Sequence, residues 1–150
     1  MAWRRCAAAG VSEPPPSSTA RLTSPTGQPN EPFGRFDDVR PYLIWPGVLA
    51  RAVRGERMGL ALVELDSNTE VAEHTHPNEQ VGFVLQGIFS FTIAGETREL
   101  HPGETYVIPA SVPHSGRAGS GGAVVIDVFS PPRDDWERLE RGDASKAAWP

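Results

Sequence analysis

The sequence predicts an all-β domain, built as an antiparallel sandwich or a closed barrel. Residues 58–65 form a nearly continuous apolar run, residues 88–93 alternate cleanly between apolar and polar, and residues 124–129 supply a late strand. Turn signals recur at nearly even spacing, at Gln86-Gly87, Ala94-Gly95 and Pro102-Gly103. The sequence shows no long amphipathic helix. Short strands joined by regular turns are typical of sandwiches and barrels.

The two ends of the chain differ from this central region. Residues 1–32 are rich in Pro, Ser, Thr and Gly and hold few large apolar side chains, so we expect a disordered tail. Residues 33–133 form the predicted barrel. In residues 134–150, acidic side chains at a helix start precede Trp136 and Leu139, which predicts a short helix followed by a frayed C-terminus.

The composition points to a single domain with small-molecule partners. The 150 residues can bury a core without help from disulfides or metals. A formal net charge of −5 argues against nucleic acid and anionic membrane surfaces, because both partners need a dense basic patch. No apolar run approaches the roughly 20 residues of a membrane-spanning helix. The single cysteine, Cys6, has no disulfide partner, which favours a reducing, cytoplasmic setting.

Three of the four histidines fall into a spaced pattern that suits a metal site. Alternate residues of a strand share a face, so His74 and His76 project the same way. A tight turn would then place Gln80 beside them, and a proline-bracketed loop in a closed barrel can return His114 to the same ion. A lone His-x-His pair is more often an ordinary solvated pair than a metal site, so the prediction depends on all four side chains.

This order and spacing resemble the two motifs of the cupin superfamily, over about residues 40–133. The motifs correspond here to His74, His76, Gln80 and Gly87, and then to Pro102-Gly103, Pro109 and Pro113-His114. The resemblance implies a jelly-roll barrel that holds one divalent transition metal ion, Mn, Fe, Co, Ni or Zn, on the three histidines and Gln80. Cupins most often have Glu at the third ligand position. A neutral Gln80 leaves the charge of the ion uncompensated, which favours Lewis-acid chemistry over redox chemistry.

The segment from Asp127 to Arg133 resembles the corresponding part of the pectin-degradation type of small cupin, whose members open 4,5-unsaturated uronates to linear keto acids. In that type the Asp, Phe and Arg line the pocket, which carries over to Asp127, Phe129 and Arg133. The resemblance implies Asp127 as a general acid and base, Arg133 as a fork for a substrate carboxylate, and Phe129 as a substrate contact. Strand alternation leaves one alternative open: if the more apolar face of residues 124–128 is the interior, Asp127 lies outside.

These features predict a metal-dependent isomerase or lyase-like enzyme that acts on a small sugar acid or keto acid. Two other functions remain open at this point. One is an iron-dependent dioxygenase, which uses the same barrel, and the other is a non-catalytic protein that binds a small metabolite. The expected partners are a carboxylated small molecule and, as the resemblance implies, a second copy of the chain paired through edge strands.

Overall fold

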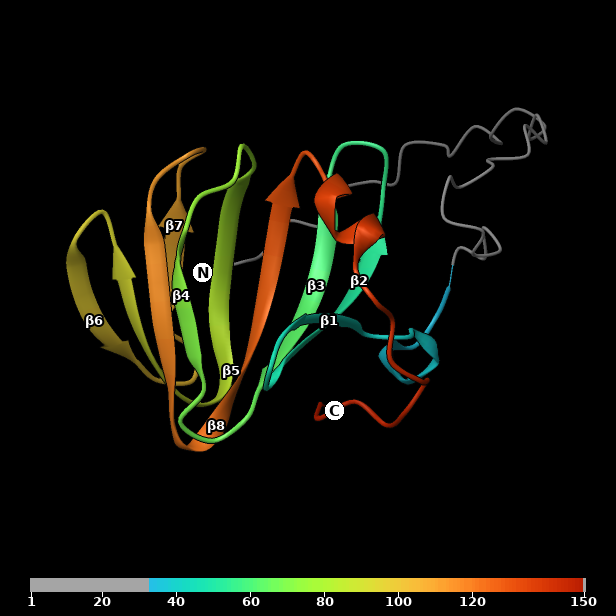
Figure 1. Ribbon diagram of the computed structural model, residues 1–150, viewed down its shortest axis with the longest axis horizontal. Coiled ribbons are helices and arrows are strands. Elements are labelled where there is room, and N and C mark those ends of the chain that lie inside the picture. Colours follow the sequence, from blue (N-terminus) through green and yellow to red (C-terminus); the bar gives the residue numbers. More distant parts are fainter. Residues whose placement is uncertain (1–32, 150) are drawn as a thin grey trace, which may run out of the picture. The chain divides into compact units, whose positions relative to one another are not determined.

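The computed structural model describes residues 33–149, which form eight strands and two short 3-10 helices (Figure 1). The strands are Tyr42–Trp45 (β1), Val48–Arg54 (β2), Gly59–Leu65 (β3), Glu70–His74 (β4), Glu79–Ile93 (β5), Glu96–Leu100 (β6), Thr105–Ile108 (β7) and His114–Ser130 (β8). The 3-10 helices are Phe36–Asp38 (η1) and Asp134–Arg138 (η2), and neither is long and apolar enough to cross a membrane. The predicted tail, residues 1–32, lies outside the described residues.

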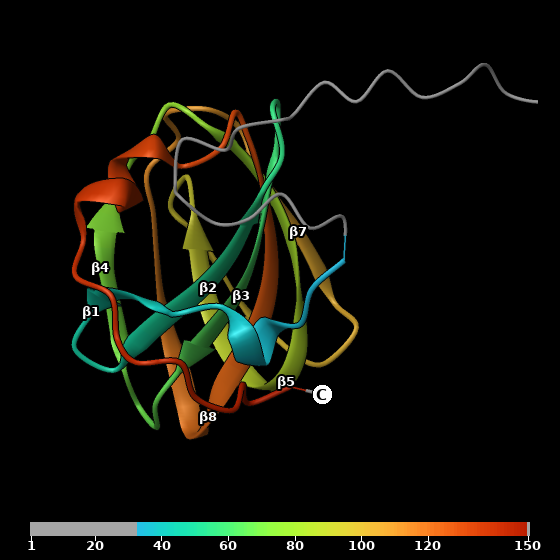
Figure 2. The same cartoon turned by 90° about the vertical axis from the view of Figure 1, so that its right-hand side faces the viewer.

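The two longest strands, β5 and β8, connect the two layers of the fold. They pair antiparallel along nearly their whole lengths, and the register shifts near Gly87. In the layer on one side of this shift, β3 pairs with β8, β2 with β3, β1 with β2, and β7 with β5. In the layer on the other side, β4 pairs with β8, and β6 pairs with β5. Figures 1 and 2 show the two layers facing each other. The prediction of an all-β, jelly-roll barrel is therefore confirmed.

One predicted turn is wrong, because Gln86-Gly87 lies inside β5. Gly87 has a φ of +76°, a conformation that glycine adopts at little cost in a bulge as well as in a turn. A Cβ at this position would lie 2.2 Å from the carbonyl oxygen of Gly122, so β8 approaches too closely for any side chain. The glycine therefore lets the strand bulge while it stays paired with β8.

The other turns and strands agree with the sequence. Ala94 and Gly95 both have positive φ, +51° and +83°, and connect β5 to β6, while Pro102-Gly103 connects β6 to β7. These angles suit a tight hairpin between antiparallel strands. The apolar run at 58–65 becomes β3, and residues 124–129 lie inside β8.

The core lies between the layers and decides which way Asp127 faces. On β8, Val125 and Phe129 belong to the main buried cluster, while Val124 packs on the opposite face with Leu62 and Ala147. Side chains alternate along a strand, so Asp127 shares the inner face with Val125 and Phe129. Its side chain is 5% exposed. The alternative that Asp127 lies on the outside is therefore excluded.

The predicted C-terminal helix is a single 3-10 turn, η2. Trp136 is buried there and packs against Tyr42 and Phe129, with ring centroids 5.8 Å and 5.3 Å away. Five residues are too few to repay the cost of nucleating an α-helix, so tertiary packing of Trp136 holds the turn in place. After residue 142 the described chain has no helix or strand, yet Ala147 is buried.

Candidate metal centre

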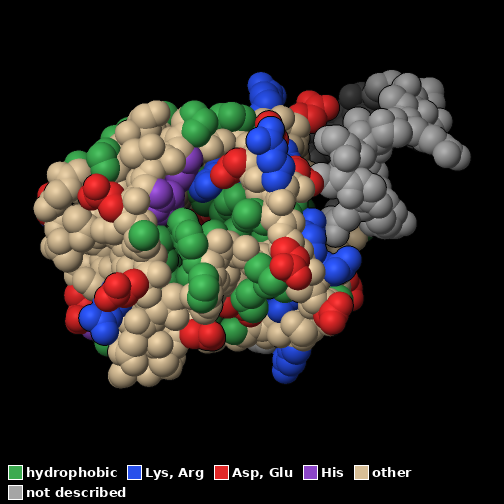
Figure 3. Space-filling view, viewed as in Figure 1, with side chains coloured by type: hydrophobic (Ala, Val, Ile, Leu, Met, Phe, Trp, Pro, Cys, Tyr) green, Lys and Arg blue, Asp and Glu red, His purple; other side chains and the backbone are tan. Residues whose placement is uncertain are grey.

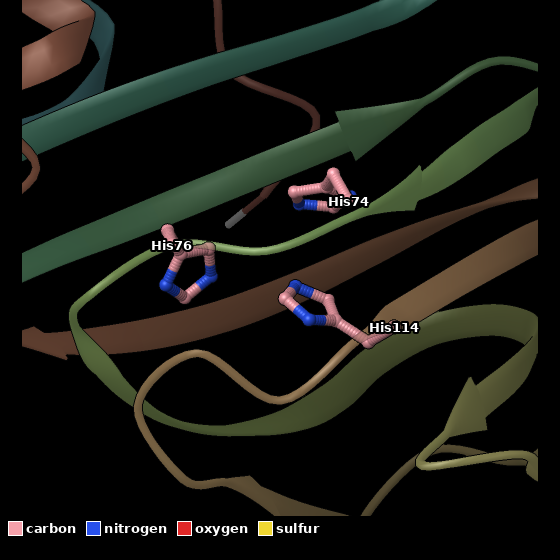
Figure 4. Close-up of side chains that lie close together, drawn as sticks. All are labelled: His74, His76 and His114. Carbon is pink, nitrogen blue, oxygen red and sulfur yellow. The ribbon is translucent and has the colours of Figure 1, made fainter.

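Three imidazoles come together at one end of the space between the layers. His74 ends β4 and pairs in register with His114, the first residue of β8, while His76 lies in the short loop before β5. Figure 4 shows the three rings around a common space. Their centroids are 4.2 to 5.8 Å apart, and their potential ligand atoms lie within 4.8 Å of one another.

Each imidazole uses its Nδ1 atom in a local hydrogen bond. His74 donates to the carbonyl oxygen of Ala72 over 2.9 Å, His76 to that of Asn78 over 3.0 Å, and His114 to that of Val112 over 2.8 Å. A carbonyl oxygen only accepts, so the proton of each neutral ring sits on Nδ1. Each Nε2 atom then carries a free lone pair, which is the form in which histidine binds a metal.

Burial keeps these rings neutral. It is the largest cause that lowers the pKa of all three histidines, and it takes the pKa of His76 to about 4, helped by the positive charge of Arg133. At neutral pH no proton therefore occupies the three Nε2 lone pairs.

Gln80 adds an oxygen to this set. Its Nε2 atom donates to Oδ1 of Asp127 over 2.7 Å, which fixes the amide so that Oε1 lies 3.1 Å from Nε2 of His76. Both of the facing atoms present lone pairs, because the proton of His76 is on Nδ1. Two lone pairs this close repel unless a proton or a cation lies between or beside them.

This arrangement fits a divalent transition ion. Three imidazole nitrogens and one amide oxygen, all free of protons, make up a mixed donor set of the kind that binds such metals in proteins. Two donors on one ion, with bonds of about 2.1 Å, are at most about 4.2 Å apart, so small rotations of the side chains complete the set. The neighbouring hydrogen bonds supply the outer support that ligating histidines need.

Asp127 lies directly behind Gln80. Its Oδ1 atom accepts hydrogen bonds from Gln80 and from the Tyr106 hydroxyl, each over 2.7 Å. Burial raises the pKa of Asp127 to about 6, although the two hydrogen bonds and the charge of Arg133 act in the opposite direction. The space for these groups comes from Gly82, where a Cβ would lie 2.4 Å from the carboxylate and 2.6 Å from the Tyr106 ring.

Arg133 sits at the mouth of the same space. Its guanidinium lies 5.3 Å from the centroid of Phe129 and 4.9 Å from that of Trp136, so two rings fix its plane. Its Nε and Nη2 atoms donate to the carboxylate of Asp135 over 2.9 and 2.8 Å. Within the described part of the chain, Nη1 makes no hydrogen bond and stays available to a ligand.

A cavity of about 70 Å³ connects these groups. Polar side chains line one end of it, and apolar and aromatic side chains of both layers line the remainder. Figure 3 shows histidine side chains at the surface beside a hollow with hydrophobic and basic side chains at its rim. The cavity is therefore open to solvent on the histidine side.

Comparison with known proteins places this fold and site in a family. The chain matches the family model of the cupin domain over residues 61–129. The solved structure of KdgF from Halomonas sp. is 33% identical, with a TM-score of 0.58, over 61% of this chain and 86% of that chain. The chain belongs to the cupin family. Within this family, it is a small cupin that is similar to KdgF.

Two curated relatives of the cupin carry functional names. The pectin degradation protein KdgF of Dickeya dadantii is 36% identical over 64 residues, which are 42% of this chain and 58% of the relative. H2HPP isomerase of Bacillus subtilis is 34% identical over 79 residues, which are 51% of this chain and 33% of the relative. The match to the isomerase therefore spans only a third of its length.

The cupin brings the predicted residues together at one site. His74, His76, Gln80 and His114 form one cluster, while Asp127, Phe129 and Arg133 line the adjoining cavity. Three further residues, which the sequence did not indicate as part of the site, contact this group: Tyr106, Asn78 and Trp45.

The contacts of these three residues follow from the fold and not from spacing in the sequence. Tyr106 pairs opposite Gly82, which itself pairs with Asp127, and only this register brings hydroxyl and carboxylate together. The side-chain amide of Asn78 donates to the carbonyl oxygens of Pro131 and Pro132 and so ties the histidine loop to the segment that carries Arg133.

Proposed function

We propose that this cupin is a metal-dependent enzyme of the isomerase or lyase type that acts on a small carboxylic acid, a sugar acid or a keto acid. The observation that carries the proposal is the set of three unprotonated Nε2 atoms and one amide oxygen directed at a common space, next to a cavity with a carboxylate and a guanidinium.

The histidines His74, His76 and His114 and the side-chain oxygen of Gln80 would hold one divalent ion. A bound ion supplies Lewis-acid chemistry, polarising an oxygen of the substrate. Gln80 is held in the ligating orientation by Asp127, since a flipped amide would bring its oxygen against the carboxylate.

Arg133 and Asp127 have complementary tasks in this proposal. Arg133 presents its free Nη1 to the substrate carboxylate, with its guanidinium packed against Phe129 and Trp136. Asp127 accepts both of its hydrogen bonds on Oδ1, which leaves Oδ2 to take a proton from one substrate atom and return it to another. Such a transfer balances within an isomerisation, because the proton removed is the proton returned.

The relatives support the same class of reaction. One named relative is an isomerase, and the other is a pectin degradation protein. Their activities are properties of those proteins, and the proposal for this chain depends on its own site.

The test combines metal content with a substrate screen. Elemental analysis of purified protein should find about one divalent ion per chain, and turnover of an unsaturated uronate or a keto acid should stop with chelator and return with metal. A fully active protein without metal would contradict the proposal. Oxygen uptake with an iron-loaded sample would instead favour the dioxygenase.

We also propose that two copies associate through the outer face of the larger layer. An unbroken row of apolar side chains crosses β2, β3, β8, β5 and β7 in paired register: Val53, Leu60, Val128, Val81 and Val107. Four of these side chains are 39 to 58% exposed. The row carries no charge, so a second copy of the same face fits it, and exposed apolar patches are typical of interaction sites.

Light scattering tests this association, with Val81→Lys as the disrupting variant. We expect a dimer for the parent protein and a monomer for the variant, and a monomeric parent would contradict the proposal. The cytoplasmic location stays a prediction from composition.

A further inference from the structure

The cavity beside the histidine cluster is apolar over most of its surface. Its walls are formed by carbon-rich side chains from both layers, among them Val63, Leu65, Phe89, Phe91, Val125 and Phe129. All six belong to the buried core cluster. The aromatic part of this wall begins directly at the histidines, since the ring of Phe129 lies 5.6 Å from His76 and that of Phe91 6.1 Å from His114.

The polar groups of the cavity are few, and most are already engaged. Gln80 donates to Asp127 and directs its oxygen to the histidine cluster, and the Tyr106 hydroxyl donates to Asp127. The cavity lining contains no Ser, Thr, Asn, Glu or Lys. The Nε2 atoms of His74 and His114 are assigned to the metal. Apart from these and the indole N–H groups of Trp45 and Trp136, the side-chain atoms without a hydrogen bond are Nη1 of Arg133 and Oδ2 of Asp127.

This lining distinguishes two kinds of carboxylic acid. A uronate brings a hydroxyl on nearly every ring carbon, and each hydroxyl that is buried without a partner weakens binding by about tenfold to a hundredfold. An alkyl or aryl body has no polar group to desolvate, and its burial raises the binding affinity by about fourfold for each CH₂ group. The free guanidinium nitrogen of Arg133 can donate to an acid group, and an ion on the histidine cluster would take one neighbouring oxygen.

We infer that the site takes a short carboxylic acid with an oxygen on the adjacent carbon and an otherwise apolar body, such as a branched alkyl or aryl 2-oxo acid, and that it disfavours polyhydroxylated uronates. The inference rests on the proposed function, because Arg133 and the histidine cluster are taken to hold the oxygenated end. The cavity of about 70 Å³ has room for about five waters, which corresponds to a body of roughly five to seven heavy atoms.

Calorimetry on the metal-loaded protein tests this inference with four probes of known composition. The probes are pyruvate, 4-methyl-2-oxopentanoate, phenylpyruvate and a 4,5-unsaturated galacturonate. We expect at least one of the two larger 2-oxo acids to bind at least tenfold tighter than pyruvate and at least tenfold tighter than the galacturonate. Equal or tighter binding of the galacturonate would overturn the inference, as would no gain over pyruvate.

A matched pair of variants tests whether the cavity wall contacts the body of the bound 2-oxo acid. Val125→Thr adds one hydroxyl to the buried wall without changing the shape of the side chain, and should weaken the preferred 2-oxo acid about threefold to tenfold. Val124→Thr makes the same change at the neighbouring residue on the opposite face of β8, where the side chain packs with Leu62 and Ala147 outside the cavity, and should have no effect on binding. Equal binding by both variants would place the ligand body outside the cavity and overturn the inference.

Metal content separates this inference from the proposed function. Each sample is assayed for bound ion before calorimetry. A protein that binds no ion contradicts the proposed function and, with it, the inference. A protein that binds one ion and prefers the galacturonate overturns the inference alone.

Discussion

The two halves of the site are held in different ways. On the histidine half, every supporting hydrogen bond is local, since each Nδ1 donates to a carbonyl two residues away in the chain. On the Asp127 half, every support comes from another strand, through Gln80 on β5 and Tyr106 on β7. Local contacts survive changes in sheet register, whereas cross-strand contacts depend on it. The hydrogen bonds that orient the histidine rings should therefore survive changes that disturb the Asp127 half.

Loss of a histidine ligand should lower metal affinity more than any other change in the site. His114→Ala removes one ligand and the partner that faces His74 across the register. We expect metal affinity to fall by at least about a hundredfold, because direct ligands matter more than the outer partners, whose loss costs about 10- to 100-fold. Titration calorimetry with Zn²⁺ or Co²⁺ measures this, with His101→Ala, on an exposed turn, as the control. Equal loss in both variants would contradict the assignment.

The substitution Asp127→Asn should affect the other half alone. The amide keeps an oxygen for the hydrogen bonds from Tyr106 and Gln80 but no longer exchanges a proton, so turnover should fall by about a hundredfold or more. Metal content should stay at the parent level. Full turnover in the variant would refute the catalytic role, and loss of metal would show that the halves are not separable.

A methyl group at Gly82 should disturb the Asp127 half by packing. The Cβ of Gly82→Ala would overlap both the carboxylate and the Tyr106 ring, so we expect a loss of about 1–3 kcal/mol in the free energy of unfolding. Urea denaturation of the metal-free protein measures it. Gly121→Ala is the matched control on β8, since nothing lies within 4 Å of its Cβ. A neutral Gly82→Ala would mean that the cross-strand cluster is not tightly packed.

Acid should act on the two halves with opposite sign. Burial lowers the pKa of His76 from 6.5 to about 4, so the unfolded chain binds more protons in this range and stability is lost as the pH falls through it. Burial raises the pKa of Asp127 from 3.8 to about 6, so the folded chain binds more protons and this group opposes the loss. Urea midpoints of the metal-free protein between pH 7.5 and 5 should fall more steeply in Asp127→Asn and less steeply in His76→Gln. The same pH dependence of the urea midpoint in both variants and the parent protein would contradict the opposite roles of the two groups.

The same division explains what the sequence could predict. Part of the histidine half follows from short-range spacing, because His74 and His76 share a strand face. The approach of His114 was predicted from the closed barrel and from the motifs that resemble those of cupins. The orientation of Asp127 and the partner Tyr106 depend on the register of three strands, which alternation alone leaves open. The bulge at Gly87 was not predictable for the same reason, since a glycine that permits positive φ serves a turn or a bulge equally well.

The protonation state of the histidines tests the central claim most directly. Long-range proton–nitrogen NMR of the metal-free protein distinguishes Nδ1–H from Nε2–H in each ring. We expect His74, His76 and His114 to carry the proton on Nδ1 at pH 7, and their Nε2 resonances, but not those of His101, to shift on addition of one equivalent of Zn²⁺. A proton on Nε2 in these rings, or a shift confined to His101, would contradict a shared metal centre.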